Sequence, residues 1–284
     1  MSSLAASRQP AGPGPSPSLA RPARLASVVG DATGRGVRVA VLDSGVDPGW
    51  QHPRFGDGVG LLARRPARDE IDPASEFRLE RTADVADQDG HGTACVDILL
   101  GIAPGVTIHP VRVFHRRRRT SLSVLVAALR WAVEQRMDVV HLSLGTAERR
   151  SMHPLYRACA ALREAGTVVV AAARPGSGVS FPAIFDNTLG VTAGEFANVH
   201  DFAWCPQEAV ECVAQGRRRA RLVGGGRREV FSNSYAAPHV SALAALCIER
   251  RRRDGEARPG IEGIRRLLAR CALPATHEPP EERR

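Results

Sequence analysis

Short apolar runs of strand length alternate along the chain with segments whose apolar residues recur at helical spacing. The runs that predict strands lie at residues 36–42, 106–114, 139–144, 167–173, 189–193 and 210–214. The segments that predict helices lie at residues 94–102, 121–136, 154–165, 234–251 and 261–271. Because several strands are apolar throughout, the alternation predicts an α/β fold with a doubly wound, mostly parallel sheet and helices on both faces. Pro110 lacks an N–H for a sheet ladder, so its run is predicted to be an edge strand or a bend.

The ends of the predicted strands carry the residues that suggest chemistry. Asp43 directly follows the first apolar run, Gly145 follows the third, and Ala173 ends the fourth. In open parallel sheets, reactive groups gather at the carboxyl ends of the strands. The pattern therefore predicts a site at this edge of the sheet.

Polar segments flank the α/β region. Residues 1–26 are rich in Ser, Pro and Ala, and without the apolar core of a secretory signal they predict a disordered leader. Residues 27–274 are predicted to form one domain, and residues 275–284 a charged tail. No run approaches the roughly 18 apolar residues of a membrane span. We therefore expect a cytoplasmic protein without a membrane partner.

The chain is basic, with a net charge of +9, and all 39 basic residues are Arg. This exclusive use of Arg resembles a genome-wide codon bias. The Arg runs at residues 116–119, 217–219 and 250–253 contain no aromatic residues for base stacking. We interpret them as solvated faces and do not expect a nucleic-acid partner. The six cysteines form no CxxC pair and several lie in apolar runs, which favours free buried thiols over disulfides.

Three polar residues stand in settings that suit catalysis, although each setting alone also has a structural explanation. Asp43, in DSG after a strand, can orient an imidazole or simply form a turn. His91, in DGHGT before a helix, is a natural general base, but loop histidines are often incidental. Ser234 begins an apolar helix, where its N–H faces any developing negative charge, or where it is a plain N-cap.

In this chain order, DSG at Asp43, HGT at His91 and S-x-A-x-P-H from Ser234 together resemble the subtilase family of serine peptidases. The segments VVHLSLG and SFPA are also similar to family segments, and the resemblance covers residues 34–273. It implies a subtilisin-like fold. It also implies that Ser234 attacks a peptide carbonyl, His91 accepts the hydroxyl proton and Asp43 orients the imidazole.

The chain departs from the family pattern at the expected oxyanion site. Subtilases carry Gly-Asn where this chain has Arg174 and Pro175. The family's Asn donates a hydrogen bond to the oxyanion, and loss of such a donor costs about 10²–10³ in rate. Asn233 stands where the family has Thr, so we predict that its side-chain amide supplies the missing donor beside the Ser234 N–H.

The resemblance also implies substrate-binding segments. Ser143, Leu144 and Gly145 are expected to pair with an extended substrate backbone and, with Ala172 and Ala173, to wall the main specificity pocket. No cofactor is implied. Calcium stabilises many family members, but no cluster of ligands in this sequence can be assigned to calcium or to another metal.

Two further positions differ from the family. Asp97 replaces a Gly in the helix after His91, and His141 replaces an Asn in VVHLSLG. We interpret His141 as a packing residue, or as one that acts through a neighbour, rather than as a catalytic residue.

We expect a serine-type endopeptidase that cleaves peptide or protein substrates through an acyl-enzyme, and intracellular processing of a specific precursor is one job that fits. The alternative is a catalytically weak or inactive subtilase fold that binds peptides. Pro175 favours this alternative, whereas the intact set of Asp43, His91 and Ser234 opposes it. Cleavage preference, physiological substrate and oligomeric state are not specified by the sequence.

Overall fold

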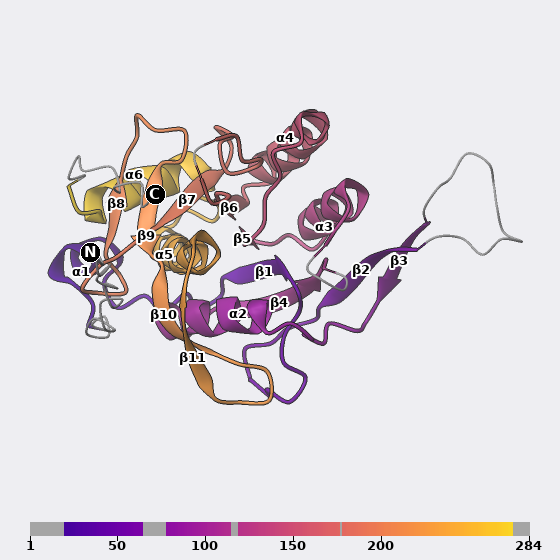
Figure 1. Cartoon of the computed structure of the whole chain (residues 1–284). Coiled ribbons are helices and arrows are strands. Elements are labelled where there is room, and N and C mark those ends of the chain that lie inside the picture. The colour runs from indigo at the N-terminus through magenta and orange to yellow at the C-terminus, as the bar shows by residue number, and fades with distance from the viewer. Residues whose placement is uncertain (1–19, 65–77, 115–118, 177, 275–284) are drawn as a thin grey trace, which may run out of the picture.

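One large sheet organises the molecule (Figure 1). The computed structural model describes residues 20–64, 78–114, 119–176 and 178–274. Nine strands follow the order β3-β2-β4-β1-β5-β6-β7-β9-β8, with antiparallel pairing only at β2–β3 and β8–β9. The strands are β1 (Arg38–Asp43), β2 (Val59–Arg64), β3 (Arg78–Thr82), β4 (Thr107–Arg112), β5 (Val139–Leu142), β6 (Val168–Ala172), β7 (Leu189–Gly194), β8 (Phe202–Trp204) and β9 (Cys212–Gln215). The prediction of a mostly parallel sheet is confirmed.

Helices cover both faces of this sheet. They are α1 (Ala23–Val29), α2 (His91–Ile102), α3 (Leu122–Glu134), α4 (Arg149–Glu164), α5 (Asn233–Arg253) and α6 (Gly260–Cys271). Alternate residues of the central strands point to opposite sides. Val39 and Val41 belong to the core with α1, α2, α5 and α6, whereas Ala40 and Leu42 belong to the core with α3 and α4. The fold is therefore doubly wound, as predicted.

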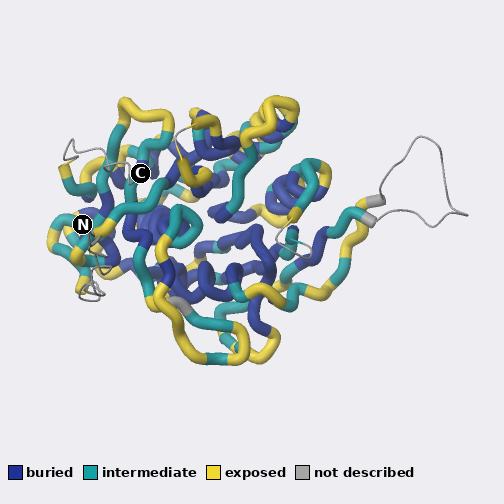
Figure 2. Tube along the Cα trace, viewed as in Figure 1, coloured by how far each residue is buried: buried dark blue, intermediate teal, exposed yellow. Residues whose placement is uncertain are grey.

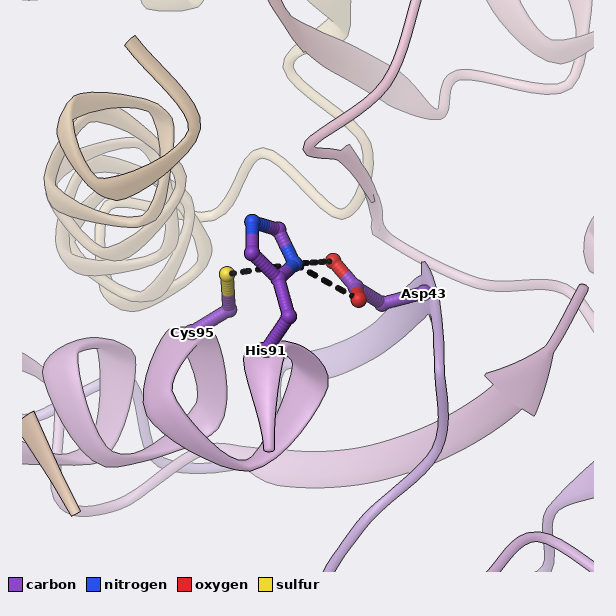
Figure 3. Close-up of side chains that lie close together, drawn as sticks. All are labelled: Asp43, His91 and Cys95. Carbon is purple, nitrogen blue, oxygen red and sulfur yellow. Dashed lines mark hydrogen bonds and ion pairs between the residues drawn. The ribbon is translucent and has the colours of Figure 1, made fainter. Parts of the chain in front are cut away.

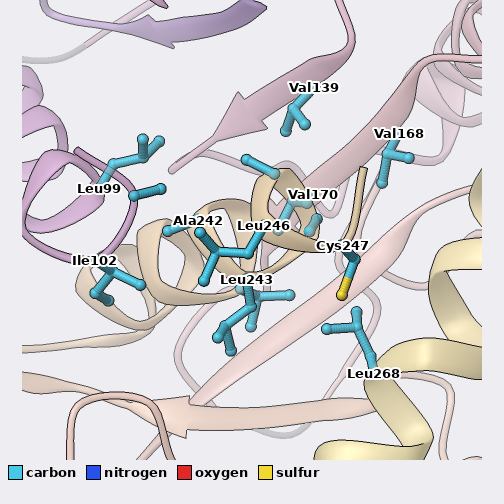
Figure 4. Close-up of a cluster of buried hydrophobic side chains, with 14 of the residues drawn as sticks. Leu99, Ile102, Val139, Val168, Val170, Ala242, Leu243, Leu246, Cys247 and Leu268 are labelled. Atoms are coloured by element: carbon cyan, nitrogen blue, oxygen red, sulfur yellow. The ribbon is translucent and has the colours of Figure 1, made fainter. Parts of the chain in front are cut away.

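Burial is greatest in the centre of the sheet and in the helices that lie directly on it (Figure 2). Every residue of β5 and β6 is buried. Figure 4 shows side chains of α5, among them Leu243 and Leu246, packed among residues of strands β5 and β6 and of helices α2 and α6. Helix α5 thus runs through the main core, where its residues 236–249 are all buried.

Several predicted boundaries move in the structure. Helix α2 begins at His91, so this histidine lies in the first turn rather than ahead of the helix. Helix α4 begins at Arg149 and includes Pro154, which the sequence placed at the helix start. Helix α1 overlaps the predicted leader, and Leu25 within it is buried, so the folded region begins before residue 27. Residues 1–19 and the predicted tail at 275–284 lie outside the described residues.

The prediction that Pro110 marks an edge strand is wrong, because β4 lies between β2 and β1. The N–H of Ile108, two residues earlier, points away from β1 and donates to the Arg54 carbonyl. Since alternate residues share a direction, the missing N–H of Pro110 faces the same side. The pairing of β4 with β2 begins only at Val111, so the proline removes no bond from that ladder.

A two-stranded hairpin, β10 (Arg217–Arg221) and β11 (Arg227–Phe231), was not predicted. Its Arg-rich strands have no apolar alternation that would reveal them. The hairpin lies across α2 (Figure 1), where Arg227 makes hydrogen bonds of 2.6 and 3.0 Å to the Asp97 carboxylate. Asp97, which replaces a family glycine, therefore ties this hairpin to the helix that carries His91.

Much of the basic charge is paired within the fold. In the run at residues 250–253, all four arginines form ion pairs, with partners Asp254, Glu256, Asp138, and Asp31 together with Glu249. The prediction of a solvated face is therefore incomplete for this run, because Arg252 and Arg253 also connect helix α5 to distant parts of the fold. Of the run at residues 116–119, only Arg119 lies in the described part of the chain.

The cysteines agree with the sequence interpretation. All six lie in described segments as free thiols, and five of them are buried. Within the described ranges, no helix combines the length and the apolar character that a bilayer span requires.

Candidate active site

The predicted site residues meet at the carboxyl edge of the central strands. Asp43 is the last residue of β1, while Ser143 follows β5 and Ala173 follows β6. These three strands are neighbours and run parallel, so their carboxyl ends lie side by side. The structure therefore places Asp43, Ser143 and Ala173 at the same edge of the sheet.

Asp43 and His91 form a direct pair (Figure 3). The Nδ1 atom of His91 lies 2.8 and 2.9 Å from the two carboxylate oxygens of Asp43. Both side chains are buried, and the backbone N–H of Ser44 also donates to Asp43 at 2.7 Å. Because Nδ1 is bound to the carboxylate, Nε2 is the ring nitrogen that remains for proton transfer.

The glycine of HGT allows this close approach. A Cβ atom at Gly92 would lie 2.2 Å from the carbonyl oxygen of Gly45, so a side chain at this position would push α2 away from the end of β1. The hydroxyl of Ser44 further accepts a hydrogen bond from the N–H of Gly92 at 2.9 Å. The DSG and HGT motifs are therefore packed against each other.

Asp87 fixes the turn that presents His91, and the sequence analysis did not single it out. One carboxylate oxygen accepts from the N–H groups of Asp89 and Gly90, at 2.9 and 2.8 Å. The other accepts from the N–H and hydroxyl of Thr93, at 2.9 and 2.6 Å. An Asp just before a helix is a common capping signal, and this could have identified Asp87. The two hydrogen bonds from Thr93 to Asp87 also explain why a threonine follows the glycine in HGT.

Burial and charge shift the pKa values of His91 and Asp43 in opposite directions. Burial alone would lower the pKa of His91, but the adjacent Asp43 carboxylate outweighs burial and raises it above the ordinary histidine value. Burial alone would raise the pKa of Asp43, but the charge and hydrogen bond of His91 lower it. The structure thus favours an ionised carboxylate beside a histidine that holds a proton readily.

Ser234 is the second residue of α5, and this helix start lies against the part of α2 that carries His91 and Cys95. Its neighbour Tyr235 has its ring centroid 5.2 Å from that of His91. The Ser234 hydroxyl donates to the carbonyl oxygen of Ser143 at 3.3 Å, and among the described residues it has no hydrogen bond to His91. The Ser234 N–H lies in the first turn, where amide groups have no acceptor within the helix.

Asn233 connects the ends of two strands. Its side-chain Nδ2 donates to the carbonyl oxygen of Ala173 at 3.0 Å, and its Oδ1 accepts from the N–H of Ala193 at 2.8 Å. These two bonds fix which way the amide points and use one of the two Nδ2 hydrogens. The predicted role of Asn233 at an oxyanion stays a prediction.

The predicted substrate-binding residues lie at the same edge. Leu144 and Gly145 extend beyond β5, whose pairing with β6 ends at Leu142 and Ala171. The next residue, Thr146, pairs with Phe181. The expected roles of Ser143, Leu144 and Gly145, and of Ala172 and Ala173 in β6 and directly after it, also stay predictions.

Cys95 lies one turn after His91 in α2 and faces the pair (Figure 3). Asp43, His91 and Cys95 each offer one ligand atom within 4.8 Å of the others. One nitrogen and one sulfur in this set do not suit calcium, which prefers six to eight oxygen ligands. Burial also raises the pKa of the Cys95 thiol, which disfavours the thiolate that binds softer metals. The geometry therefore suits a proton-transfer pair beside a neutral thiol.

Comparison with known proteins identifies the family. The profile of the subtilase family matches residues 34–277. A thermophilic serine proteinase from Bacillus sp. (strain AK1) is 30% identical over 80% of this chain and 56% of its own length. Alkaline elastase YaB from Bacillus sp. (strain YaB) is 28% identical over 75% and 54%. An intracellular serine protease from Paenibacillus polymyxa is 27% identical over 75% and 67%.

Solved structures agree with this assignment at the level of the fold. A cold-adapted subtilisin-like serine proteinase superimposes with a TM-score of 0.62 at 22% identity, covering 84% of this chain and 83% of that one. A lanthipeptide protease gives a TM-score of 0.63 at 19% identity, covering 84% and 80%. The chain spans about half the length of the first curated relatives, with 54% and 57% of their residues matched. From the arrangement of Asp43, His91 and Ser234 and from the match over residues 34–277, the chain belongs to the subtilase family.

Proposed function

We propose that this protein is a serine-type endopeptidase that hydrolyses peptide bonds through an acyl-enzyme intermediate. The observation that carries the proposal is the buried hydrogen bond between Asp43 and His91 beside the helix start that bears Ser234. Membership of the subtilase family supports it. Nucleophile, base and orienting carboxylate are the three groups that acyl transfer requires.

The proposed reaction begins when the Ser234 hydroxyl turns from the Ser143 carbonyl toward Nε2 of His91. Hydrogen bonds of this kind often tighten only when substrate is bound. The Ser234 oxygen then bonds to the peptide carbonyl carbon while its proton moves to His91. His91 returns the proton to the leaving amine as the C–N bond breaks, and water releases the acyl group by the same steps in reverse order. Asp43 holds the imidazole and stabilises its charged form.

The oxyanion requires donors that are already in place. The Ser234 N–H is one, and we assign the second to the free Nδ2 hydrogen of Asn233. Since the amide is held at Ala173 and Ala193, it needs no reorganisation when charge develops. In this assignment Asn233 compensates for Pro175, which has neither an N–H nor a side-chain donor.

The substrate is proposed to be an extended peptide or protein segment that pairs with residues 143–145, next to Ala172 and Ala173. We further propose a cytoplasmic enzyme that processes few substrates. The similarity to an intracellular serine protease of Paenibacillus polymyxa is consistent with this, although another relative, from Bacillus subtilis (strain 168), is named a minor extracellular protease.

A peptide-binding protein without activity is the second candidate. Two observations favour it: Pro175 replaces the family's donor, and the Ser234 hydroxyl is bonded to Ser143 instead of His91. Hydrolysis of fluorescein-labelled casein separates the candidates. We expect wild-type protein to release fluorescent peptides and Ser234→Ala to release none. Equal retention of casein by both proteins without hydrolysis would support the binding protein.

A further inference from the structure

His141 lies at the centre of a buried hydrogen-bond chain that ends at the Ser234 backbone. It is the third residue of β5 and is fully buried. Its Nε2 lies 2.7 Å from the hydroxyl of Ser143, and its Nδ1 lies 2.9 Å from the hydroxyl of Ser241 in α5. The Ser143 hydroxyl in turn lies 2.7 Å from the carbonyl oxygen of Ser234.

The Ser234 carbonyl needs this partner because of Pro238. In an α-helix, the carbonyl of residue 234 would accept from the N–H of residue 238. Pro238 lies inside α5 and has no N–H, so the intrahelical bond is missing. The Ser143 hydroxyl replaces it at 2.7 Å, and the Cys95 thiol donates a second, longer bond of 3.6 Å to the same oxygen. A part-buried carbonyl in the first turn is thereby satisfied by the residue that follows β5.

The number of protons available fixes the direction of the bonds that link Ser234, Ser143 and His141. A carbonyl only accepts, so the single proton of Ser143 goes to Ser234, and the Ser143 oxygen must accept from His141. His141 therefore carries its proton on Nε2. Burial lowers the pKa of His141 to about 4, so the ring is neutral and its bare Nδ1 accepts from the Ser241 hydroxyl.

We propose that His141 is a positioning residue for the nucleophile: it orients the Ser143 hydroxyl, which holds the Ser234 carbonyl that Pro238 leaves without a helical partner. The nucleophile's own hydroxyl donates to the Ser143 carbonyl, so one residue fixes both the backbone and the side chain of Ser234. This role rests on the proposed function. A packing residue in the same place would need the shape of the ring but not its Nε2 proton.

Variants at His141 and its two neighbours test the proposal through the rate of labelling by a fluorophosphonate probe. His141→Phe keeps a ring but loses the donor, and it is expected to lower the second-order labelling rate about 10-fold. His141→Gln, which returns an N–H near the Nε2 position, is expected to recover most of that rate. Ser143→Ala should lower the rate similarly, and combining it with His141→Phe should add little.

Ser241→Ala is the matched control. It also removes one buried hydrogen bond of His141, but on the side away from Ser143, so the melting temperature should fall while the labelling rate stays within about 3-fold. A loss as large as that of His141→Phe would overturn the proposal, as would wild-type labelling in folded His141→Phe. If His141→Phe does not fold, Ser143→Ala decides by the same criterion.

The tautomer of His141 gives a readout that does not depend on activity. Long-range ¹H–¹⁵N NMR of the full chain should show a neutral ring with its proton on Nε2. A proton on Nδ1, or a charged ring near neutral pH, would overturn the proposal. A wild-type protein that is not labelled at all would contradict the proposed function, and the tautomer would then decide the inference alone.

Discussion

The base and the nucleophile of the site are held in different ways. His91 is hydrogen-bonded directly to Asp43, and Asp87 accepts hydrogen bonds from the turn that carries His91. The base is therefore positioned by hydrogen bonds with residues close to it in the fold. Ser234 is instead bonded to Ser143, and Asn233 beside it is bonded to Ala173. The base therefore follows the family pattern closely, whereas the nucleophile depends on distant residues, several of which depart from that pattern.

The difference indicates where function is vulnerable. The hydrogen bond between His91 and Asp43 joins two motifs that are recognisable in the sequence, so the cost of losing it in activity can be predicted. On the nucleophile side, our proposals rest on two residues that differ from the family, Asn233 and His141, together with Pro175 and Pro238. Activity in this chain is therefore expected to be decided on the nucleophile side.

The largest effect should come from breaking the base. Asp43→Asn leaves the geometry nearly intact but favours the wrong tautomer of His91, so kcat is expected to fall by about 10⁴-fold. Casein hydrolysis measures the loss. Asp47→Asn is the matched control, since Asp47 is also buried but binds the N–H groups of Gly49 and Gly224. Equal losses in both variants would mean that any buried carboxylate here is merely structural.

Removing the proposed oxyanion donor should have the next largest effect. Asn233→Ala is expected to lower kcat by about 10²–10³ with little change in KM, because the donor acts only on the developing charge. Asn233→Thr, which restores the family residue, should recover part of the rate through its hydroxyl. Full activity in Asn233→Ala would remove Asn233 from the mechanism.

The pH dependence of the labelling rate should reveal the electrostatic coupling between His91 and Asp43. His91 must be neutral to accept the Ser234 proton, and Asp43 raises the His91 pKa, so labelling by the probe should increase about tenfold per pH unit while His91 stays mostly protonated. The inflection is expected above the ordinary histidine value of 6.5. In Asp43→Asn, the inflection should move to lower pH. An inflection near 6.5 in wild-type protein would contradict the coupling.

A change at the far end of α5 should affect stability but not activity. One oxygen of Glu249 accepts from the N–H groups of Thr33, Gly34 and Arg35, at 2.7, 2.6 and 2.8 Å. Glu249→Gln is expected to lower the free energy of unfolding by about 2 kcal/mol, measured by urea denaturation, without changing the labelling rate.

The same variant has a predicted pH dependence. Burial alone would raise the pKa of Glu249, but the three backbone donors and Arg253 lower it. A lowered pKa means that the stability is present above the ordinary glutamate value of 4.5 and is lost as the pH falls through the lower folded-state value. The wild-type advantage over Glu249→Gln should therefore shrink in acid. A constant advantage would show that the charge of Glu249 is not involved.

The sequence predicts most of the fold, because the patterns that specify its strands and helices lie within short segments of the chain. The apolar runs of β1, β5 and β6 and the periodicity of α3, where Ser121 accepts from the N–H of Val124, specify elements directly. The β10–β11 hairpin escaped prediction because its stability comes from contacts such as Arg227 with Asp97, which no short pattern reveals.

For the site, the sequence predicts which residue types meet but not how they are bonded. DSG and HGT predict Asp43 beside His91, since in this chain order they resemble the motifs of the subtilase family. The bond from Ser143 to Ser234, which spans 91 positions, follows only from the packing of α5 against β5. The role of His141 likewise emerges only when Pro238 is seen to remove the helical partner of that carbonyl.

The most direct test of the account is labelling of the purified protein with a fluorophosphonate probe, with the modified residue located by mass spectrometry. The account predicts one modified residue, Ser234, with labelling lost in Ser234→Ala and strongly reduced in Asp43→Asn. Folded wild-type protein that stays unlabelled from neutral to alkaline pH, or that is modified elsewhere, would contradict it. That result would leave a peptide-binding protein on a subtilase fold.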